Sequence, residues 1–272
     1  MAKKTAEKAV KKTLYYRFWE FIAKLIFRKR KVVYSVTPEE GEGAVYVSNH
    51  AGALAPANMA LWFDRPVRPW TISYIFDKEV NANFVYHDFL FARGDKCKWF
   101  SRFVAKLVAI LLPPLLTAWR SIKVYRTDGG ILSTFKESIT TLMSGENLII
   151  FPECPEKRYK FVNGFSDGFA ELGKLYHKVT GKCLRFYPMY IGAGLKTINV
   201  GEPVVFNPEN ADGDAERARI SDTLNERIES IAESLPEHKP TPYKTEKFYK
   251  YYPEFVDNQT EYWKFCNQKR SE

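Results

Sequence analysis

The sequence predicts an α/β fold in which a largely parallel central sheet is flanked by helices, with an amphipathic helix at the N-terminus. Short apolar segments typical of strands alternate along the chain with longer segments whose apolar residues recur at helical spacing. One short segment, NLIIF at 147–151, is a continuous apolar run of the kind found in parallel sheets. A hydrophobic fraction of 45% in 272 residues supplies enough apolar surface for one large core.

The N-terminal segment predicts a helix that lies on a membrane surface. Leu14, Phe18, Phe21 and Leu25 recur at helical spacing, with charged residues on the opposite side that make the segment too polar to span a bilayer. Residues 1–31 hold eleven basic and two acidic side chains, which accounts for the whole net charge of +9. A basic tail on a neutral body favours an anionic membrane surface and argues against nucleic acid as a partner. The alternative is a helix packed on its own domain.

The central part of the chain predicts alternating strands and helices. Strands are expected at 44–48, 68–75, 121–126, 147–151 and 183–191, with one or two more within 197–206. Helices are expected at 56–63, 131–145, 166–181 and 215–235. The apolar stretch 101–119, which Pro113 and Pro114 interrupt, predicts either a buried, kinked helix pair or a second membrane-contacting element. Lys106 and the two prolines argue against a simple transmembrane span.

Three parts are expected: a basic amphipathic helix at 1–36, an α/β domain at 37–236, and a tail rich in Pro, Lys and Tyr at 237–272. The four cysteines are far apart and form no CxxC pair, which argues against a disulfide framework or a zinc site and favours a reducing compartment. The N-terminus also lacks the apolar core and cleavage site of a secretory signal.

Polar residues follow three of the predicted strands. Asn49 and His50 follow the strand at 44–48, Arg126 ends the strand at 121–126, and Glu153 follows NLIIF. In open α/β sheets, ligands bind outside the carboxyl ends of the strands. A base, a cation and a carboxylate at that edge suit acyl transfer to a hydroxyl of a phosphate-bearing acceptor, with His50 taking the hydroxyl proton. The alternatives are a structural hydrogen bond for His50, a surface ion pair for Arg126 and a cap for Glu153.

Four segments together resemble the glycerolipid acyltransferase family, which includes the 1-acylglycerol-3-phosphate acyltransferases. SNHAGALA matches the Asn-His of the family's first block, and IKVYR matches the second block, a strand that ends in Arg. IIFPECPEKRYKFVNGF keeps the Phe-Pro-Glu of the third block, and RFYPMYIG, with Pro188, matches the apolar fourth block. The order and spacing agree over residues 44–206.

The resemblance implies an acyltransferase of phospholipid biosynthesis on the cytoplasmic face of a membrane, peripheral or monotopic. It would move a fatty acyl group from a thioester-type donor, such as acyl-CoA or acyl carrier protein, to the hydroxyl of a lysophospholipid-like acceptor such as 1-acylglycerol 3-phosphate. No metal or redox cofactor is expected, because the donor carries the energy. The residues implied are His50 as the catalytic base, with Asn49, Arg126, Glu153, Lys157 and Arg158 in substrate binding.

The sequence departs from the family pattern at two places. Ala55 occupies the position of the Asp that orients the histidine in the family, so another group must hold the ring; the candidate carboxylates are Asp64, Asp77, Asp88 and Glu153. Cys154, Pro155, Glu156 and Lys157 replace the usual Gly, Thr, Arg and Ser, so Lys157 or Arg158 would take the place of the displaced Arg. A non-catalytic lipid- or membrane-binding member of the same fold is the alternative that the missing Asp invites. A His–Cys154 acyl-thioester pair is a further alternative.

Overall fold

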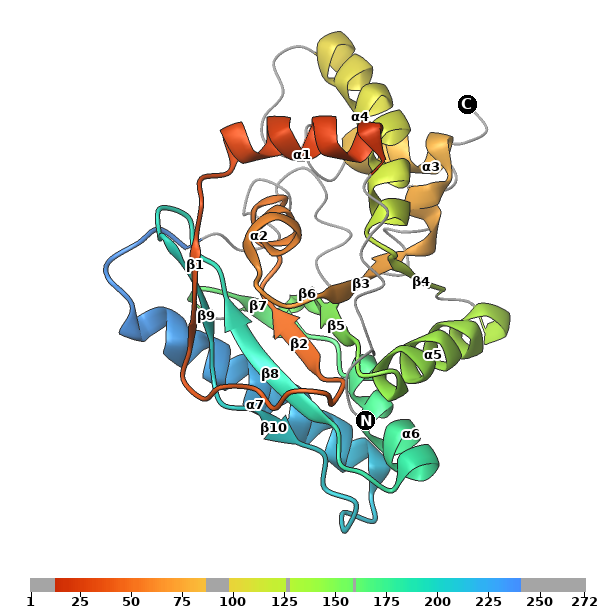
Figure 1. The fold of residues 1–272 in the computed structure, drawn as a ribbon, viewed down its shortest axis with the longest axis vertical. Coiled ribbons are helices and arrows are strands. Elements are labelled where there is room, and N and C mark those ends of the chain that lie inside the picture. The colour runs from red at the N-terminus through yellow and green to blue at the C-terminus, as the bar shows by residue number, and fades with distance from the viewer. Residues whose placement is uncertain (1–12, 87–97, 126–127, 159, 241–272) are drawn as a thin grey trace, which may run out of the picture.

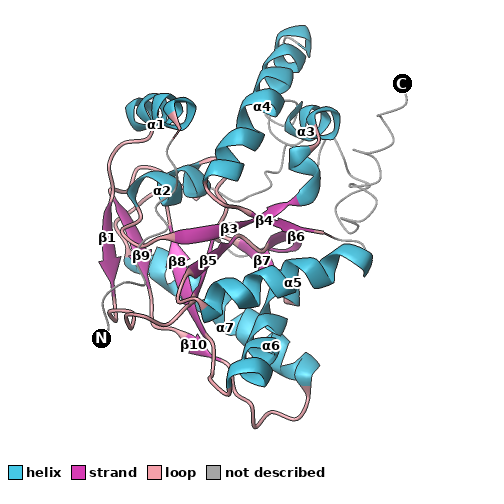
Figure 2. Ribbon diagram, turned by 45° about the vertical axis from the view of Figure 1, so that its right-hand side comes forward, coloured by secondary structure: helices cyan, strands magenta, loops and turns pink. Residues whose placement is uncertain are grey.

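A central sheet forms the middle layer of the protein, with helices on both faces (Figures 1 and 2). The computed structural model describes residues 13–86, 98–125, 128–158 and 160–240. The strand order is β1-β9-β8-β2-β5-β3-β4, and β10 pairs with the start of β8. The strands are β1 (Lys31–Tyr34), β2 (Val45–Ser48), β3 (Val67–Ile72), β4 (Ile122–Val124), β5 (Asn147–Ile150), β8 (Arg185–Tyr190), β9 (Thr197–Val200) and β10 (Val204–Val205).

Most neighbouring strands run parallel, which confirms the predicted fold class. Strand β2 is parallel to both β5 and β8, and β3 is parallel to both β5 and β4. Only β9 and β10 run antiparallel to β8 in this sheet, and β1 is parallel to β9. The carboxyl ends of β2, β5 and β8 therefore lie side by side at one edge of the sheet.

Two helical layers bury the sheet. Helices α1 (Leu14–Ile26), α2 (Leu54–Trp62), α3 (Lys78–Phe84) and α4 (Lys98–Ala118) lie on one side, and α5 (Asp128–Met143), α6 (Glu171–Thr180) and α7 (Gly213–Ser234) lie on the other (Figure 2). Val45 and Val47 of β2 pack into the core beneath α5–α7, whereas Tyr46 packs into the core beneath α2. Because both faces are covered, every residue of β2 and β5 is buried, as the continuous apolar run at 147–151 indicated for β5.

Several elements differ from the sequence-based expectation. The strand predicted at 68–75 ends at Ile72 and continues as a 3₁₀ turn, η1 (Ser73–Phe76). Helix α3 was not predicted, nor was the hairpin of β6 (Glu153–Arg158) and β7 (Asn163–Phe165). The helix predicted at 166–181 begins with a 3₁₀ turn, η4 (Gly168–Ala170), before α6; it is closed as expected by Gly181, whose φ is +68°.

Helix α4 runs without interruption through Pro113 and Pro114. Only 11% of its most apolar 18-residue window is buried, so the buried helix pair expected as one alternative does not form. Among the described helices, α4 is the one that is long and apolar enough to cross a membrane, judged by length and composition alone.

The N-terminal segment divides into helix and strand. Helix α1 begins after Thr13, whose side chain accepts a hydrogen bond from the Tyr16 amide, and it ends at Ile26. The basic residues that follow lead directly into β1, which pairs with β9 at the edge of the sheet. The domain boundaries proposed at 36 and 236 remain predictions.

Candidate active site

The candidate site is built around the loop that joins β2 to α2. Asn49 and His50 follow the last residue of β2, at the edge where β5 and β8 also end. Ala51 and Gly52 both have positive φ angles, +46° and +64°. Glycine adopts this left-handed conformation at no steric cost, whereas alanine there is strained by roughly 1 kcal/mol or more. The surrounding contacts must therefore hold this loop in place.

Asn49 fixes the start of the loop to β8. Its side chain is fully buried; Nδ2 donates to the carbonyl oxygen of Ile191 at 3.1 Å, and Oδ1 accepts from the Ile191 amide at 2.9 Å. An asparagine amide has one donor group and one acceptor that match a backbone peptide in this way. The pair therefore extends the β2–β8 contact by one residue and sets the position at which His50 leaves the sheet.

The carbonyl oxygen of Gly52 holds the His50 ring. The distance between Nδ1 of His50 and this oxygen is 2.6 Å. A carbonyl oxygen only accepts hydrogen bonds, so Nδ1 must carry the proton, and in the neutral ring Nε2 carries the lone pair. The ring also contacts Phe151 after β5, with the ring centroids 5.3 Å apart. The left-handed turn at Ala51 and Gly52 directs the Gly52 carbonyl back toward the ring of His50, which lies two residues earlier in the chain.

Glu153 holds the backbone of the same loop. Its carboxylate is buried and accepts the His50 amide at 2.5 Å and the Asn163 amide at 2.8 Å, and the Ala51 amide is a third donor. The residue begins β6, while Asn163 begins β7, so one side chain ties the β6–β7 hairpin to the histidine loop. The sequence predicted that Glu153 lies at this edge of the sheet. It could not predict which amides the carboxylate binds, because backbone groups are the same in every residue type.

The environment of Glu153 favours its neutral form. Burial raises the pKa of the carboxyl to about 7, against the opposing effect of the three amide donors, which lower it. The carboxylate is therefore close to half ionised at neutral pH.

The position of the family's Asp lies in the apolar core. Ala55 is completely buried, with 0% of its surface exposed, and belongs to the apolar core cluster that includes Met59 and Ile191. A carboxylate there would be buried among apolar side chains at a cost of several kcal/mol. The His50 ring is bonded through Nδ1 to the Gly52 carbonyl.

The candidate replacement carboxylates have other partners. Asp64 accepts the hydroxyl of Tyr34, and Asp77 caps the first turn of α3 by accepting the amides of Glu79 and Val80. Asp88 lies outside the described residues. Glu153 contacts His50 through the backbone amide.

The structure brings together Asn49, His50 and Glu153 of the residues that the sequence nominated. Arg126 lies outside the described residues, and the side chains of Lys157 and Arg158, in β6, lie outside the described set as well. Their assignment to substrate binding stays a prediction. The side chain of Cys154 is buried.

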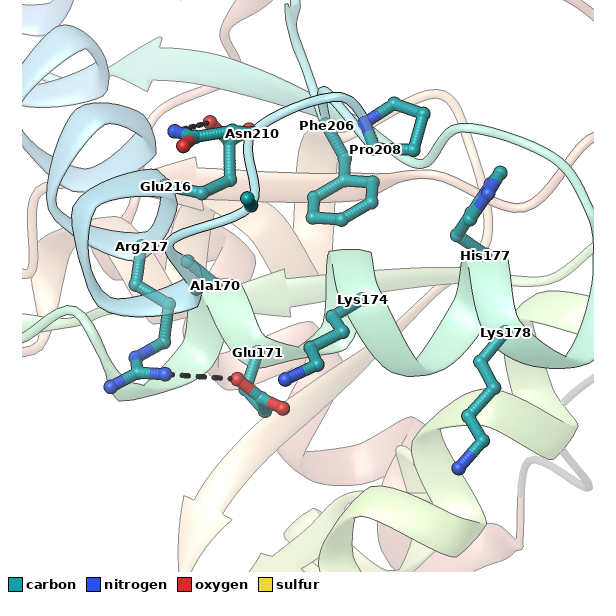
Figure 3. A pocket seen from close by; sticks show the side chains of 12 residues that line it. Ala170, Glu171, Lys174, His177, Lys178, Phe206, Pro208, Asn210, Glu216 and Arg217 are labelled. Carbon is teal, nitrogen blue, oxygen red and sulfur yellow. Dashed lines mark hydrogen bonds and ion pairs between the residues drawn. The ribbon is translucent and has the colours of Figure 1, made fainter.

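A cavity of about 440 Å³ lies away from this loop (Figure 3). Its lining comes from α6, from the segment after β10 and from the first turn of α7, including Lys174, His177 and Phe206. The Phe206 amide bonds to the Leu184 carbonyl just before β8, so this cavity lies at the opposite, amino end of the parallel strands. In the described part of the chain, no group of three or more His, Cys, Asp or Glu residues is arranged to hold a metal ion.

Comparison with known proteins gives a likeness to solved structures. No family model and no curated protein sequence matches the chain. The fold is similar to the crystal structure of the 1-acyl-sn-glycerophosphate (LPA) acyltransferase PlsC from Thermotoga maritima, with a TM-score of 0.46 and 13% sequence identity over 81% of each chain.

Proposed function

We propose that the chain is a membrane-associated acyltransferase that moves a fatty acyl group from a thioester-type donor to the hydroxyl of a lysophospholipid-like acceptor such as 1-acylglycerol 3-phosphate. The observation that carries the proposal is the hydrogen bond between Nδ1 of His50 and the Gly52 carbonyl. It selects the tautomer in which Nε2 can take the acceptor's hydroxyl proton as the hydroxyl oxygen attacks the thioester carbonyl. The proton then passes to the departing thiolate, and the products are an ester and a thiol.

A positioned histidine base suits acyl transfer because the other requirements come from the substrates. The thioester is already activated, so neither a metal nor a redox cofactor is needed. Acyl-CoA and acyl carrier protein both present such a thioester. The Glu153 carboxylate and the Asn49 amide hold the backbone on either side of the base, and a base held within a few tenths of an ångström of its working geometry retains the entropic advantage of a bound complex.

Two exposed apolar helices support a membrane location. On α1 and α4, large apolar side chains are between 43% and 86% exposed; they are Leu14, Phe18, Phe21, Leu25 and Ile26 of α1 and Trp99, Phe100, Phe103, Leu107 and Ile110 of α4. The hydroxyl of Tyr15 donates to the Leu111 carbonyl at 2.9 Å and joins the two helices. Both lie on the side of the sheet that α2 covers, which is also where the His50 loop leads. Apolar patches of this kind mark lipid or protein contacts.

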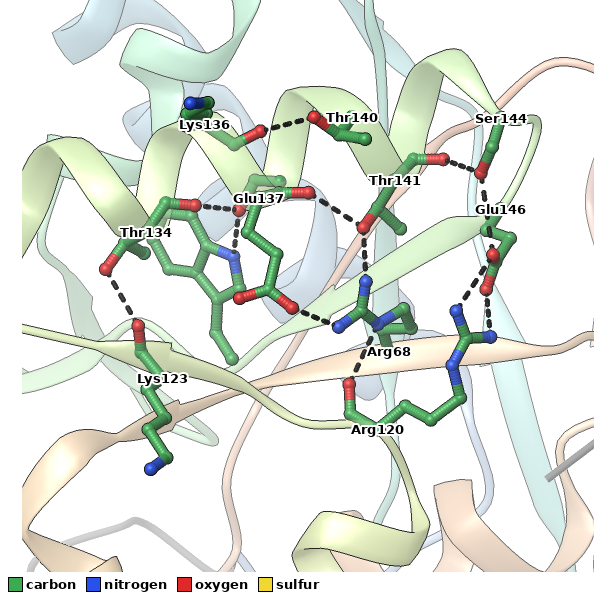
Figure 4. Close-up of polar contacts among 12 residues, drawn as sticks. Arg68, Arg120, Lys123, Thr134, Lys136, Glu137, Thr140, Thr141, Ser144 and Glu146 are labelled. Carbon is green, nitrogen blue, oxygen red and sulfur yellow. Dashed lines mark hydrogen bonds and ion pairs between the residues drawn. The ribbon is translucent and has the colours of Figure 1, made fainter. Parts of the chain in front are cut away.

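The end of α4 is firmly attached to the domain, as a membrane-contacting element requires. Arg120, in the left-handed conformation just after α4, pairs with Glu146, and its carbonyl accepts a hydrogen bond from Nε of Arg68 at 2.8 Å (Figure 4). The same Arg68 guanidinium donates to Thr141 and to Glu137 of α5. These contacts tie the end of α4 to β3 and α5.

Exposed basic residues flank the apolar side chains on both helices. They include Arg17, Lys98, Arg102 and Lys106, and residues 1–31 carry the excess positive charge of the chain. This arrangement suits an anionic membrane surface, and for a phospholipid-forming enzyme it points to the cytoplasmic face, with peripheral or monotopic attachment.

The proposal is tested by turnover on paired acceptors. Purified protein with acyl-CoA or acyl carrier protein as donor should acylate 1-acylglycerol 3-phosphate faster than monoacylglycerol, which lacks the phosphate. Arg126→Ala should raise KM for the phosphate-bearing acceptor by about tenfold or more, as expected for a lost charge-assisted contact, with little change for the neutral one. Equal effects on both acceptors would mean that Arg126 does not read the phosphate.

Membrane binding is predicted to depend on the exposed apolar residues of α1 and α4. Leu25→Ser and Leu107→Ser should each weaken binding to anionic vesicles by about tenfold, because burying a leucine side chain is worth about 1.5–3 kcal/mol and 1.4 kcal/mol is tenfold. Substitution is preferable to truncation of residues 1–31, since β1 begins at Lys31. Vesicle sedimentation with anionic and zwitterionic lipids measures the effect.

Leu132→Ser is the matched control for this experiment. Leu132 is 73% exposed on α5, on the opposite side of the sheet, and Leu25 is 68% exposed. The control should bind vesicles as the wild type does. If all three variants sediment alike, the α1–α4 surface does not contact lipid.

A further inference from the structure

His238, just beyond α7, contacts two segments at the carboxyl edge of the sheet. Its Nε2 lies 2.8 Å from the hydroxyl of Tyr190, and its ring stacks on Phe161 with the centroids 4.8 Å apart and the planes 24° from parallel. Its Cδ2 lies so close to Gly192 that a Cβ added at that position would be 2.8 Å away. A half-buried histidine in the segment after α7 thus joins the β6–β7 turn to the end of β8.

Hydrogen bonds on both ring nitrogens fix the orientation of His238. Nδ1 lies 2.8 Å from the Pro236 carbonyl, which only accepts, so Nδ1 carries a proton. In the neutral ring, Nε2 then accepts the hydrogen bond that Tyr190 donates. Tyr190 is 0% exposed, so its hydroxyl needs this partner in order to be buried without the cost of an unmade hydrogen bond.

Each contact of His238 lies one or two residues from a group that holds the Asn49–His50 pair. Tyr190 and Gly192 flank Ile191, whose peptide groups bond to the Asn49 side chain. Phe161 precedes by two residues Asn163, whose amide donates to the Glu153 carboxylate.

Helix α7 holds the same turn from a second point. The Phe161 amide donates to both oxygens of Glu229, at 3.0 and 3.1 Å. The segment from α7 to His238 therefore contacts residues that adjoin both backbone supports of the candidate base in the sequence.

We propose that His238 is a positioning residue that latches the β6–β7 turn to the end of β8 and thereby fixes the loop that carries His50. It acts through Asn49 and Glu153 and touches neither substrate. Without the ring, the turn at Phe161 and the β8 end keep their own hydrogen bonds and the edge-to-face contact between Phe161 and Tyr190, whose centroids lie 6.2 Å apart, but they lose the histidine that stacks on one ring and hydrogen-bonds to the other. The kinetic part of this inference rests on the proposed acyl transfer; the structural part does not.

Hydrogen exchange in the full-length protein tests the latch without any substrate. In His238→Ala, amide exchange in peptides that cover 48–54 and 160–164 should quicken by about tenfold, because only the Phe161–Tyr190 ring contact and the core packing then hold the turn against the end of β8. His238→Phe keeps the stacking on Phe161 but not the hydrogen bond, so it should fall between the alanine variant and the wild type. This second variant also covers the case in which alanine at 238 destabilises the whole domain.

His177→Ala is the matched control, because this histidine is also half-buried and also lies against a phenylalanine, with the His177 and Phe206 ring centroids 5.9 Å apart. It sits on α6 at the amino end of the strands and should leave exchange in both peptides unchanged. Unchanged exchange in His238→Ala, or an equal increase in His177→Ala, would overturn the latch.

Turnover separates positioning from a purely structural role. With an active wild type, His238→Ala should lower kcat by about tenfold with a smaller change in KM, and His238→Phe should recover part of that loss. Faster exchange with an unchanged kcat would overturn the positioning role. If His238→Ala exchanges faster but the wild-type protein acylates no acceptor, the latch stands and the acyltransferase proposal is refuted instead.

Discussion

His50→Ala should lower kcat for acyl transfer by about 10²–10⁴-fold, the usual contribution of a general base, while the melting temperature stays within a few degrees of the wild type. The physical reason is that the backbone of His50 ties this loop to the β6–β7 hairpin. Its Nδ1 partner is the Gly52 carbonyl on a half-exposed loop, and its ring contact is with Phe151. The backbone at this position is held separately, because it is the His50 amide that donates to Glu153. Removing the side chain therefore leaves the main support of the loop in place.

Added imidazole provides a second readout that a structural role would not give. A base that diffuses into the space left by the ring should restore part of the activity of His50→Ala, with a rate that rises with imidazole concentration. His177→Ala, at the other end of the sheet, should keep wild-type activity. If His50→Ala instead melts early and the wild type acylates no lysolipid with any thioester donor, the histidine is structural and a non-catalytic lipid-binding protein becomes the better description.

The convergence of these residues could be predicted from the sequence because it depends on strand direction alone. The continuous apolar run at 147–151 indicates a strand of a parallel sheet, and the alternation of strands with helices along the chain predicts that its neighbours are parallel to it. Parallel strands place their carboxyl ends at one edge, so Asn49, His50 and Glu153 had to approach one another. The amphipathic pattern of α1 likewise survives in the structure, with Leu14, Phe18, Phe21 and Leu25 exposed on one side.

The partner of the His50 ring could not be predicted, because backbone groups leave no residue-type signal. A carboxylate was the expected partner of the ring in place of the missing Asp, whereas Nδ1 bonds to the backbone carbonyl of Gly52. That contact depends on two consecutive positive φ angles, one of them at Ala51, a residue that rarely adopts such a conformation. A glycine at position 52 is compatible with the turn, but a glycine alone does not predict it.

The hairpin was not predicted, and the sequence left two alternatives open for α4, for different reasons. The run ECPEKR carries a proline and several charges, which lowers its intrinsic preference for a strand, and it becomes one only by pairing with β7. Helix α4 has the composition of a buried helix, and only the packing of the surrounding elements shows that its apolar side faces outward.

The stability of the protein should depend on the protonation of Glu153, in the direction opposite to that of an ordinary surface glutamate. Its pKa is about 7 in the folded protein and 4.5 as the unperturbed value, so the folded state binds the proton more tightly. The resulting stabilisation is fully present below pH 4.5 and is lost as the pH rises through 7. A difference of about 2.5 units corresponds to about 3 kcal/mol between pH 4 and pH 8.

Glu153→Gln isolates this contribution, because the amide is nearly isosteric and does not titrate. Chemical denaturation of the two proteins at a series of pH values gives the difference in unfolding free energy, wild type minus variant, in which the other titrating groups cancel. That difference should fall by about 3 kcal/mol from pH 4 to pH 8. The lost acceptor for one of the amides adds a constant offset and leaves the slope unchanged.

Glu146→Gln supplies a control of opposite sign. Burial works to raise the pKa of Glu146, but the hydrogen bonds and charge of Arg120 outweigh it and hold that pKa below its usual value. A carboxylate with a lowered pKa stabilises the fold above pH 4.5 and loses this effect as the pH falls, so the wild-type minus variant difference should rise with pH. If the Glu153 difference also rises with pH, or stays flat, the three amide donors outweigh burial. The loop of His50 would then be held by an ionised carboxylate at neutral pH.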